Sequence, residues 1–250
     1  MRLAGKIAIV TGAASGFGEG IARAFAAEGG RVVVADINEE GAARVAGSLG
    51  EAAVAIGGDV SKGPDCAAIV ERAVAAFGGL DIVVNNAGTT HRNKPLLEVT
   101  EAEFDRVYAV NVKSIYWMTQ AAVPVLRRQG RGGSIINIGS TAGIRPRPGL
   151  TWYNGSKGAV NTITLSMAQE LAKDNIRVNS ICPVIGATAL LEEFMGMPDT
   201  PENRGRFLAT IPLGRMSTPA DVANAAVWLA DPASSFITGI LLPVDGGRTA

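Results

Sequence analysis

Residues 6–28 constrain the fold of this chain more than any other stretch, because they combine a buried strand, a glycine-rich turn and a helix in direct succession. The apolar run at 7–10 is typical of a strand that is covered on both faces. The turn at 11–18 holds three glycines, which let the backbone approach a large ligand closely. Apolar residues then recur at helical spacing. The free N–H groups at the start of such a helix favour a pyrophosphate.

An acid at the end of a second apolar strand strengthens this interpretation. Asp36 follows the run at 31–35 and lies 20 residues beyond Gly16, the middle glycine of the turn. In dinucleotide-binding folds, an acid at this place accepts hydrogen bonds from the adenosine ribose. The glycine pattern alone, GxxxGxG, would also fit an ordinary turn. Together with Asp36 it predicts dinucleotide binding.

Composition and charge limit the classes of function. The chain has 250 residues, 47% of them hydrophobic, which is enough to bury a sizeable core. Its 23 basic residues equal its 23 acidic ones, so we expect no nucleic-acid partner. The apolar run at 7–10 is too short for a signal peptide or a membrane span, so we expect no membrane partner and a soluble, cytoplasmic protein.

The residues that usually hold metals or form disulfides are scarce. Cys66 and Cys182 are the only cysteines and do not form a CxxC motif, which argues against a disulfide framework and a thiolate zinc site. His91 is the only histidine and is interpreted as a loop residue. We therefore expect no bound metal.

Strands and helices alternate along the whole chain without a linker. This alternation predicts one α/β domain over residues 1–250, a Rossmann-type doubly wound fold with a mostly parallel, seven-stranded sheet flanked by helices. Besides the elements named above, we expect helices at 39–48, 64–77 and 100–128, strands at 52–56, 81–84, 134–138 and 237–242, and a capped last helix starting near 218.

Small and polar residues follow two of the expected strands, at the sheet edge where ligands bind in open α/β folds. Asp59 and Val60 come after the third strand, where the acid either contacts an adenine or opens the next turn. The fourth strand leads into Asn86, Ala87 and Gly88, residue types that are also common in ordinary turns.

Tyr153 and Lys157 are the chemical centre of the sequence. A spacing of four places the phenol and the ammonium group on one face of a helix. A fixed positive charge near a phenol favours the phenolate, so it lowers the pKa of the tyrosine from its ordinary value of about 10. Such a tyrosine can act as a general acid or base.

In combination, these motifs resemble the short-chain dehydrogenase/reductase family over nearly the whole chain. The resemblance implies that Asn111, Ser140, Tyr153 and Lys157 form a catalytic tetrad. In this tetrad, the resemblance implies that the tyrosine exchanges a proton with the substrate oxygen and that the serine binds the same oxygen. The lysine is expected to contact the nicotinamide ribose and to lower the pKa of the tyrosine. The asparagine is expected to hold a water molecule. The cofactor-binding residues expected from the motifs are Gly12, Ser15, Gly16, Phe17, Gly18, Asp36, Ile37, Asp59, Val60, Asn86, Ala87, Gly88, Tyr153, Lys157, Pro183, Gly186 and Thr188.

The chain departs from the family pattern after the sixth strand. Val184 replaces the usual glycine after Pro183, and Gly186 stands where a branched residue is usual, while Thr188 still matches the family's cofactor-contacting threonine. The following segment, about 188–210, resembles the family's variable substrate lid. Its many apolar side chains predict a cover over an apolar substrate, although packing against a neighbouring subunit would use the same residues.

Arg145 and Arg147 lie between Ser140 and Tyr153, close to the expected substrate. They either clamp a carboxylate or form a solvated pair on a surface loop, and the sequence favours the second interpretation.

The resulting expectation is an NAD-dependent oxidoreductase that transfers a hydride between NAD(H) and a secondary alcohol or ketone, with an apolar substrate. Asp36 would repel the 2′-phosphate of NADP, and Ser15 and Ile37 offer no compensating cation. The alternatives are a 3-oxoacyl thioester reductase that uses NADPH and, more distantly, a catalytically idle NAD-binding regulator. From the family we also expect a homotetramer.

Overall fold

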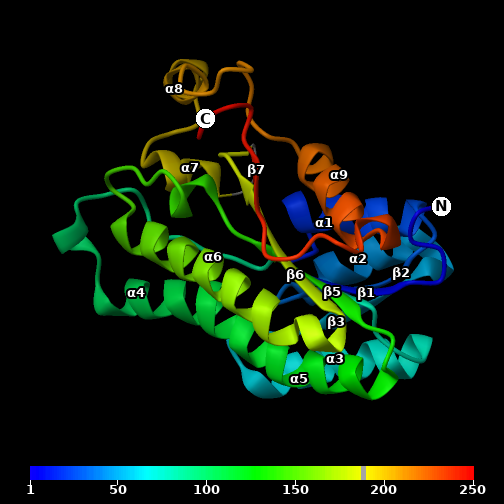
Figure 1. The fold of residues 1–250 in the computed structure, drawn as a ribbon. Helices are drawn as coiled ribbons and strands as arrows, with labels where there is room; N and C mark the ends of the chain where they lie inside the picture. Colours follow the sequence, from blue (N-terminus) through cyan, green and yellow to red (C-terminus); the bar gives the residue numbers. More distant parts are fainter. Residues whose placement is uncertain (187–189) are drawn as a thin grey trace.

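The computed structural model describes residues 1–186 and 190–250, and the strands of this part form one sheet of seven (Figure 1). Their order is β3-β2-β1-β4-β5-β6-β7, and every pairing is parallel. The strands are β1 (Ile7–Thr11), β2 (Arg31–Asp36), β3 (Ala53–Gly57), β4 (Ile82–Asn85), β5 (Gly133–Ile138), β6 (Ile176–Pro183) and β7 (Leu241–Val244). The predicted seven-stranded Rossmann-type sheet is confirmed.

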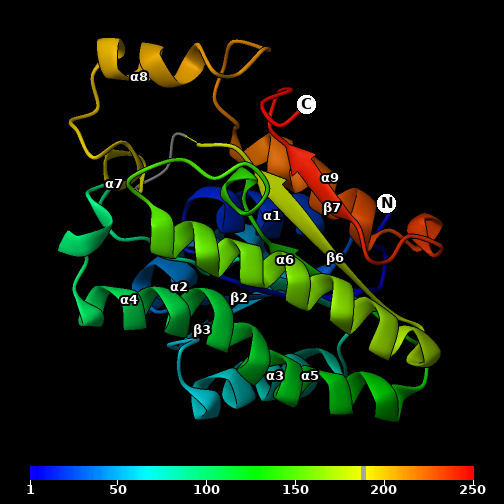
Figure 2. The same cartoon turned by 60° about the vertical axis from the view of Figure 1, so that its left-hand side comes forward.

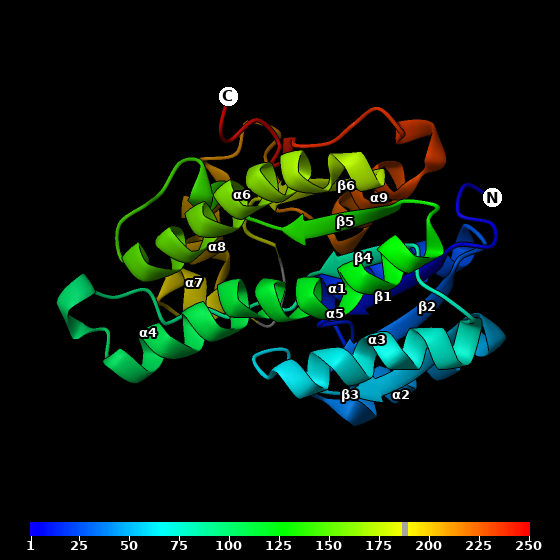
Figure 3. The same cartoon turned by 60° about the horizontal axis from the view of Figure 1, so that its bottom comes forward.

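Two helical layers cover the sheet. One layer consists of α1 (Gly16–Ala27), α2 (Glu39–Leu49) and α9 (Pro219–Ala230), and the other contains α3 (Gly63–Phe77), α5 (Ser114–Gln129) and α6 (Thr151–Leu171), which face the viewer in Figure 3. Alternate residues of β1 pack against opposite helical layers. Ala8 and Val10 pack with α1 and α9. Ile7 and Ile9 pack with α3 and α5. This double cover explains the uninterrupted apolar run at the start of the chain.

The expected helix at 100–128 is not continuous. It consists of α4 (Glu101–Tyr108), a π-helical turn (Ala109–Lys113) and α5. Its start is as predicted, because Thr100 and Glu103 form a reciprocal capping box. The π turn coincides with Asn111, whose amide is bonded to Thr89 after β4 and to Ser156 on α6. These ties hold the widened turn against two other segments.

The last strand begins four residues later than expected, at Leu241. The carbonyl of Ile237 accepts hydrogen bonds from Arg177 and Asn179 of β6, and Gly239 has a φ of 74°. Because side chains of β6 bind the Ile237 carbonyl and Gly239 has a left-handed backbone conformation, residues 237–240 lie outside β7.

Two short helices lie over the carboxyl ends of the strands (Figures 1 and 2), namely α7 (Leu191–Met195) and α8 (Pro201–Leu208). Leu191 and Met195 pack with Met216 in a small apolar cluster of their own. These helices occupy most of the segment expected to be a lid. Within the described part of the chain, no helix is both long enough and apolar enough to cross a membrane.

Candidate active site

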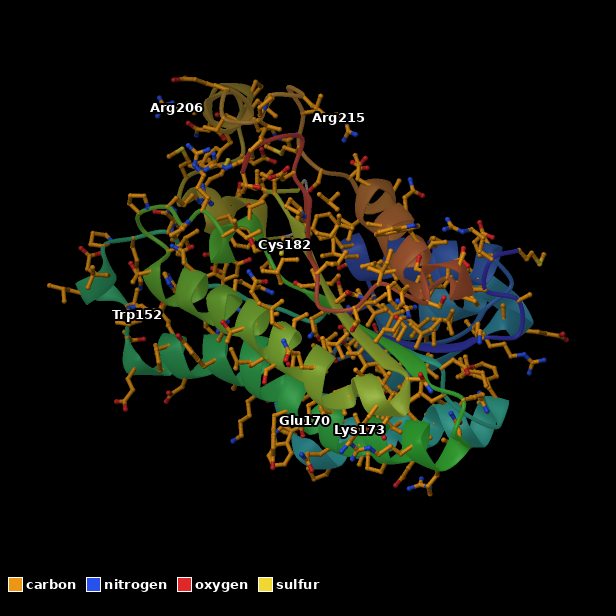
Figure 4. All side chains as sticks on the ribbon, in the orientation of Figure 1. Trp152, Glu170, Lys173, Cys182, Arg206 and Arg215 are labelled. Carbon is orange, nitrogen blue, oxygen red and sulfur yellow. The ribbon has the colours of Figure 1, made fainter. Side chains whose placement is uncertain are left out.

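A cavity of about 830 Å³ opens at the carboxyl ends of the strands, where the strand order reverses between β1 and β4. Cys182, near the end of β6, marks this edge of the sheet in Figure 4, and Arg206 lies farther up that view on α8. The predicted site residues that line the cavity are Gly12, Ser15, Gly16, Phe17, Asp36, Ile37, Asp59, Val60, Asn86, Ala87, Gly88, Ser140, Tyr153, Lys157, Pro183 and Gly186. Asn111 and Gly18 are not among the described residues that line it, and Thr188 lies outside the described residues.

The glycine turn is built for close backbone approach. Gly12 has a φ of 63°, and a Cβ there would lie 2.8 Å from the Cα of Ala87. Asn86 fixes the turn from the neighbouring strand, because its amide donates to the carbonyls of Thr11 and Gly12 at 2.8 and 3.0 Å. Gly18 serves packing, since a Cβ there would lie 2.2 Å from the carbonyl oxygen of Gly12. The turn therefore leaves room for a phosphate at the start of α1.

Both oxygens of Asp36 are held in place at the end of β2. One accepts a hydrogen bond from the backbone N–H of Ala14 and the other from that of Asn38, each at 2.9 Å. Arg44 lies beside the turn, but its guanidinium is occupied by the Ala14 carbonyl at 2.7 Å and by Glu19 at 3.3 Å. A fixed carboxylate at this point of the cavity suits a ribose diol.

Asp59 opens the turn that follows β3, and its contact with an adenine stays a prediction. It lines the cavity, and it also accepts hydrogen bonds from the N–H and the hydroxyl of Ser61 at 3.0 and 2.7 Å, which opens the turn before α3. The bond from the Ser61 hydroxyl is the largest cause of a pKa below the ordinary value of this carboxyl.

Ser140, Tyr153 and Lys157 meet on one wall of the cavity. Ser140 follows β5 directly, and its hydroxyl accepts a hydrogen bond from the N–H of Ala142. Tyr153 and Lys157 come from the first turns of α6 and are 6% and 5% exposed. The Lys157 ammonium donates to the carbonyl of Ile138 at 2.8 Å, which leaves two N–H groups for a ligand.

The expected lowering of the Tyr153 pKa by Lys157 is wrong, because burial raises this pKa instead. Burial raises the pKa of Tyr153 to about 12, and the groups that counteract it are the Ser140 hydroxyl and the charge of Arg147. Burial also lowers the pKa of Lys157 to about 8. The Lys157 nitrogen lies 5.9 Å from the centre of the tyrosine ring and is bonded to a carbonyl, so desolvation outweighs the pairing that the spacing suggested.

Asn111 lies behind the cavity wall. Its side-chain oxygen accepts a hydrogen bond from the N–H of Thr89 at 2.8 Å, and its nitrogen donates to the Thr89 carbonyl and the Ser156 hydroxyl at 2.9 and 3.0 Å. The amide thus joins the loop after β4 to α6, which carries Tyr153 and Lys157. This geometry is that of a residue that positions the site.

The unusual Gly186 has a steric explanation in this chain. A Cβ at Gly186 would lie 2.5 Å from the ring of Phe17, so the aromatic residue of the glycine turn occupies the space of the usual branched side chain. Val184 is buried, and its carbonyl accepts a hydrogen bond from Ser217 at 3.0 Å. Pro183 and Gly186 still line the cavity despite the departure from the family pattern.

The two loop arginines differ in position. Arg145 is exposed and donates to the carbonyl of Arg248 at 2.9 Å, whereas Arg147 is half-buried and donates to the carbonyl of Phe194 at 2.8 Å. Both line the cavity, so the favoured interpretation as a solvated surface pair is wrong for Arg147. Sequence reasoning missed Arg248, because no local pattern connects the end of the chain with this loop. His91 lies in a loop as expected, yet it is only 1% exposed.

Comparisons with known proteins agree with this geometry. A family model described as enoyl-(acyl carrier protein) reductase matches residues 12–249. The 4-formylbenzenesulfonate dehydrogenase TsaC1/TsaC2 of Comamonas testosteroni is 55% identical over 251 residues, which cover 99% of each chain. The chain belongs to the short-chain dehydrogenase/reductase family. Galactitol 2-dehydrogenase of Agrobacterium fabrum, another relative, is 38% identical with the same coverage of both chains.

A solved structure supports the same assignment. The 3-ketoacyl-(acyl-carrier-protein) reductase from Brucella melitensis, complexed with NADH, matches with a TM-score of 0.94 and 45% identity, covering 99% of this chain and 100% of that one. The predicted class is therefore confirmed: this short-chain dehydrogenase/reductase is an oxidoreductase that transfers a hydride between a nicotinamide cofactor and a CH–OH group of a small molecule. Among the described residues, no group of three or more His, Cys, Asp or Glu could hold a metal ion.

Proposed function

We propose that this protein catalyses reversible hydride transfer between NAD(H) and a secondary alcohol or ketone with an apolar body. The observation that carries the proposal is the joint placement of Ser140, Tyr153 and Lys157 on one wall of a cavity whose far end holds the glycine turn and Asp36. A proton carrier and a dinucleotide cradle thus share one site. We retain the expectation that residues 1–250 act as one unit with a lid over about 188–210.

In the reductive direction, the substrate oxygen lies between Ser140 and Tyr153. Bound NADH supplies the hydride, so negative charge develops on that oxygen. Tyr153 donates its proton to the oxygen, and the Ser140 hydroxyl stabilises the same oxygen by a hydrogen bond. Lys157 would hold the nicotinamide ribose through the two N–H groups that its bond to Ile138 leaves free. In the oxidative direction Tyr153 takes the proton back from the alcohol.

The preference for NAD over NADP rests on Asp36. Its oxygens are fixed by the backbone of Ala14 and Asn38, so the carboxylate cannot turn away from a 2′-phosphate without losing two hydrogen bonds. Arg44, the cation beside the turn, is engaged by Glu19. A ribose diol is favoured at this point, and a phosphate is repelled.

The alternative activity is reduction of a 3-oxoacyl thioester with NADPH, and the names of relatives support its thioester part. The FabG reductase of Thermotoga maritima is 38% identical over 254 residues, covering 99% of each chain. The carboxylate of Asp36, which would repel a 2′-phosphate, argues against NADPH as the coenzyme in this alternative. A catalytically idle NAD-binding regulator would have no need for Tyr153 and Lys157 in the cavity wall.

We also propose a homotetramer in the cytoplasm. A second cavity, between α4, α5 and α6, is lined mostly by apolar and aromatic side chains, and Tyr116 on this face is 53% exposed. Such a face suits a second copy of the chain. Cys66 and Cys182 are both buried and free, which fits a reducing compartment.

The proposal is tested by a substrate panel with coenzyme in excess. We expect NAD(H)-dependent turnover of small aryl and alkyl ketones and their secondary alcohols, with kcat/KM higher than for a 3-oxoacyl thioester. Glu71→Ala, a change of an exposed residue on α3 that lines neither cavity, serves as the control variant. Turnover of the thioester alone would favour the alternative. Cofactor binding without turnover of any panel member would favour the regulator.

A further inference from the structure

The charges that line the cavity are segregated. Among the described lining residues, the acids are Asp36 and Asp59, both at the adenosine end. Arginines occupy the substrate side, where Arg147 comes from the loop before α6, Arg206 from α8 and Arg248 from the segment after β7. An apolar substrate alone would gain nothing from guanidinium groups at this place.

Among the arginines that line the cavity, Arg147 is the one whose charge acts on Tyr153. It is half-buried, its guanidinium lies 4.9 Å from the ring centre of Phe207, and one N–H donates to the Phe194 carbonyl. Among the described residues, no carboxylate lies within ion-pair distance of it, so most of its five donors remain available for a ligand.

Arg248 adds a second positive charge on the same side. Burial lowers the pKa of Arg147, and the charge of Arg248 lowers it further. The backbone of Arg248 is tied to the loop by the hydrogen bond from Arg145 at 2.9 Å, and its side chain forms no ion pair with any described residue. Two like charges beside an apolar cavity repel each other, and an anion bound between them would remove that cost.

An apolar path connects these charges with the reacting position. The ring of Phe194 packs edge to face against Tyr153, with 5.1 Å between ring centres, and the carbonyl of the same residue holds Arg147. Leu150 and Leu190 also line this part of the cavity. A compact apolar body therefore fits between Tyr153 and the guanidinium groups.

We propose that the substrate is an organic anion whose carboxylate or sulfonate is bound by Arg147 and Arg248, with the reacting carbonyl at the opposite end of a compact apolar body. The inference rests on the proposed hydride transfer at Tyr153 and adds the chemical class of the substrate. Guanidinium groups bind such planar or tetrahedral oxyanions through paired N–H donors. Arg147 and Arg248 are thus specificity-determining residues.

Three ketones of similar shape test the proposal with the full-length protein and NADH. They are 4-acetylbenzoate, 4-acetylbenzenesulfonate and the neutral 4-acetylbenzamide. We expect kcat/KM for at least one anion to exceed that for the amide by about tenfold or more, mainly through KM, as a charge-assisted hydrogen bond requires. Comparison of the two anions distinguishes carboxylate from sulfonate recognition.

Variants assign the preference to the arginines. Arg147→Gln and Arg248→Gln should each bring the ratio of anion to amide close to one, and Arg147→Lys should retain part of it. Arg128→Gln, an exposed arginine in the last turn of α5, is the matched control and should keep the ratio of the unmodified protein. If Arg147 only anchors the lid, its variants will impair all three ketones alike and the ratio will stay unchanged, which overturns the proposal.

Binding separates this inference from the proposed function. Calorimetry of the NAD complex with 4-acetylbenzoate and 4-acetylbenzamide needs no turnover, because the oxidised coenzyme has no hydride to give to a ketone. A preference of about tenfold for the anion that disappears in Arg147→Gln supports the anion site even if no ketone is reduced, a result that would contradict the proposed reaction alone. Equal affinity for the anion and the amide in the unmodified protein would overturn the anion site and leave the reaction intact.

Discussion

At the residue scale, we propose that Asp36 determines which coenzyme the site accepts. Both of its oxygens are fixed by backbone N–H groups, so the carboxylate stays where a 2′-phosphate would lie. We expect kcat/KM with NAD to exceed that with NADP by about tenfold or more, and Asp36→Ala to narrow this ratio by a similar factor. Steady-state kinetics with both coenzymes checks this, with Glu71→Ala, an exposed acid on α3, as the control. Equal kcat/KM for both coenzymes in the unmodified protein would contradict it.

Burying Lys157 lowers the free energy of unfolding by an amount that depends on pH. Burial lowers its pKa to about 8, below the value of about 10.5 in the unfolded chain, so unfolding takes up a proton between these two values. The contribution of Lys157 to the free energy of unfolding therefore rises as pH increases from about 8 to 10.5. Tyr153 acts in the opposite sense above pH 10, because its pKa is raised to about 12.

This linkage predicts the behaviour of Lys157→Met in urea unfolding without cofactor. The free energy of unfolding of the unmodified protein, relative to the variant, should increase by about 2 kcal/mol between pH 7 and pH 10. Lys173→Met, a change of an exposed residue just after the end of α6 (Figure 4), should show no such trend. A difference that stays constant or decreases over this range would show that the Lys157 pKa is not lowered.

The residues of the cofactor site were largely predictable, because each belongs to a short local motif. Gly12, Asp36 and Asn86 lie at strand ends that the apolar pattern identifies. The contact between Gly186 and Phe17 was not predictable, since it joins residues 169 positions apart through packing alone. The raised pKa of Tyr153 also depends on burial, which helical spacing does not report.

At the element scale, Asn111 joins three segments. It holds the π turn between α4 and α5 to the loop after β4 and to α6 through three hydrogen bonds. Asn111→Ala would remove the side-chain partner of the N–H and carbonyl of Thr89, which are partly buried. We expect a loss of about 2–3 kcal/mol in the free energy of unfolding together with a lower kcat. Denaturation and steady-state kinetics measure the two effects.

A matched control for this variant is Asn203→Ala on α8, where the exposed amide donates only to the Pro198 carbonyl. It should change stability by less than about 0.5 kcal/mol. Full stability and activity in Asn111→Ala would contradict the positioning role. The sequence predicted one helix here because apolar spacing does not distinguish an α turn from a single π turn, which long-range hydrogen bonds stabilise.

At the scale of the whole molecule, the face formed by α4, α5 and α6 remains uncovered in the single chain. Tyr116 on this face is 53% exposed. We expect light scattering to give about four times the chain mass of 25.7 kDa, and Tyr116→Arg to give a smaller assembly. Trp228→Arg on α9 tests a separate exposed site. A mass of 25.7 kDa for the unmodified protein would contradict the tetramer.

The sheet and its layers followed from the sequence because alternating strands and helices leave few topologies. The arrangement of residues on the substrate side of the cavity could not be predicted from the sequence in this way. It combines the loop before α6, the two helices over the sheet edge and the segment after β7, and only the folded chain brings Arg147 and Arg248 together.

The central claim is that Tyr153 carries the proton during hydride transfer, and the kcat of Tyr153→Phe tests it most directly. The change removes one hydroxyl and keeps the ring that packs against Phe194. With a good alcohol substrate and saturating NAD, the account predicts a kcat lower by about a hundredfold or more, while NADH binding measured by fluorescence is retained. A Tyr153→Phe variant that turns over at a nearly unchanged rate would contradict the account.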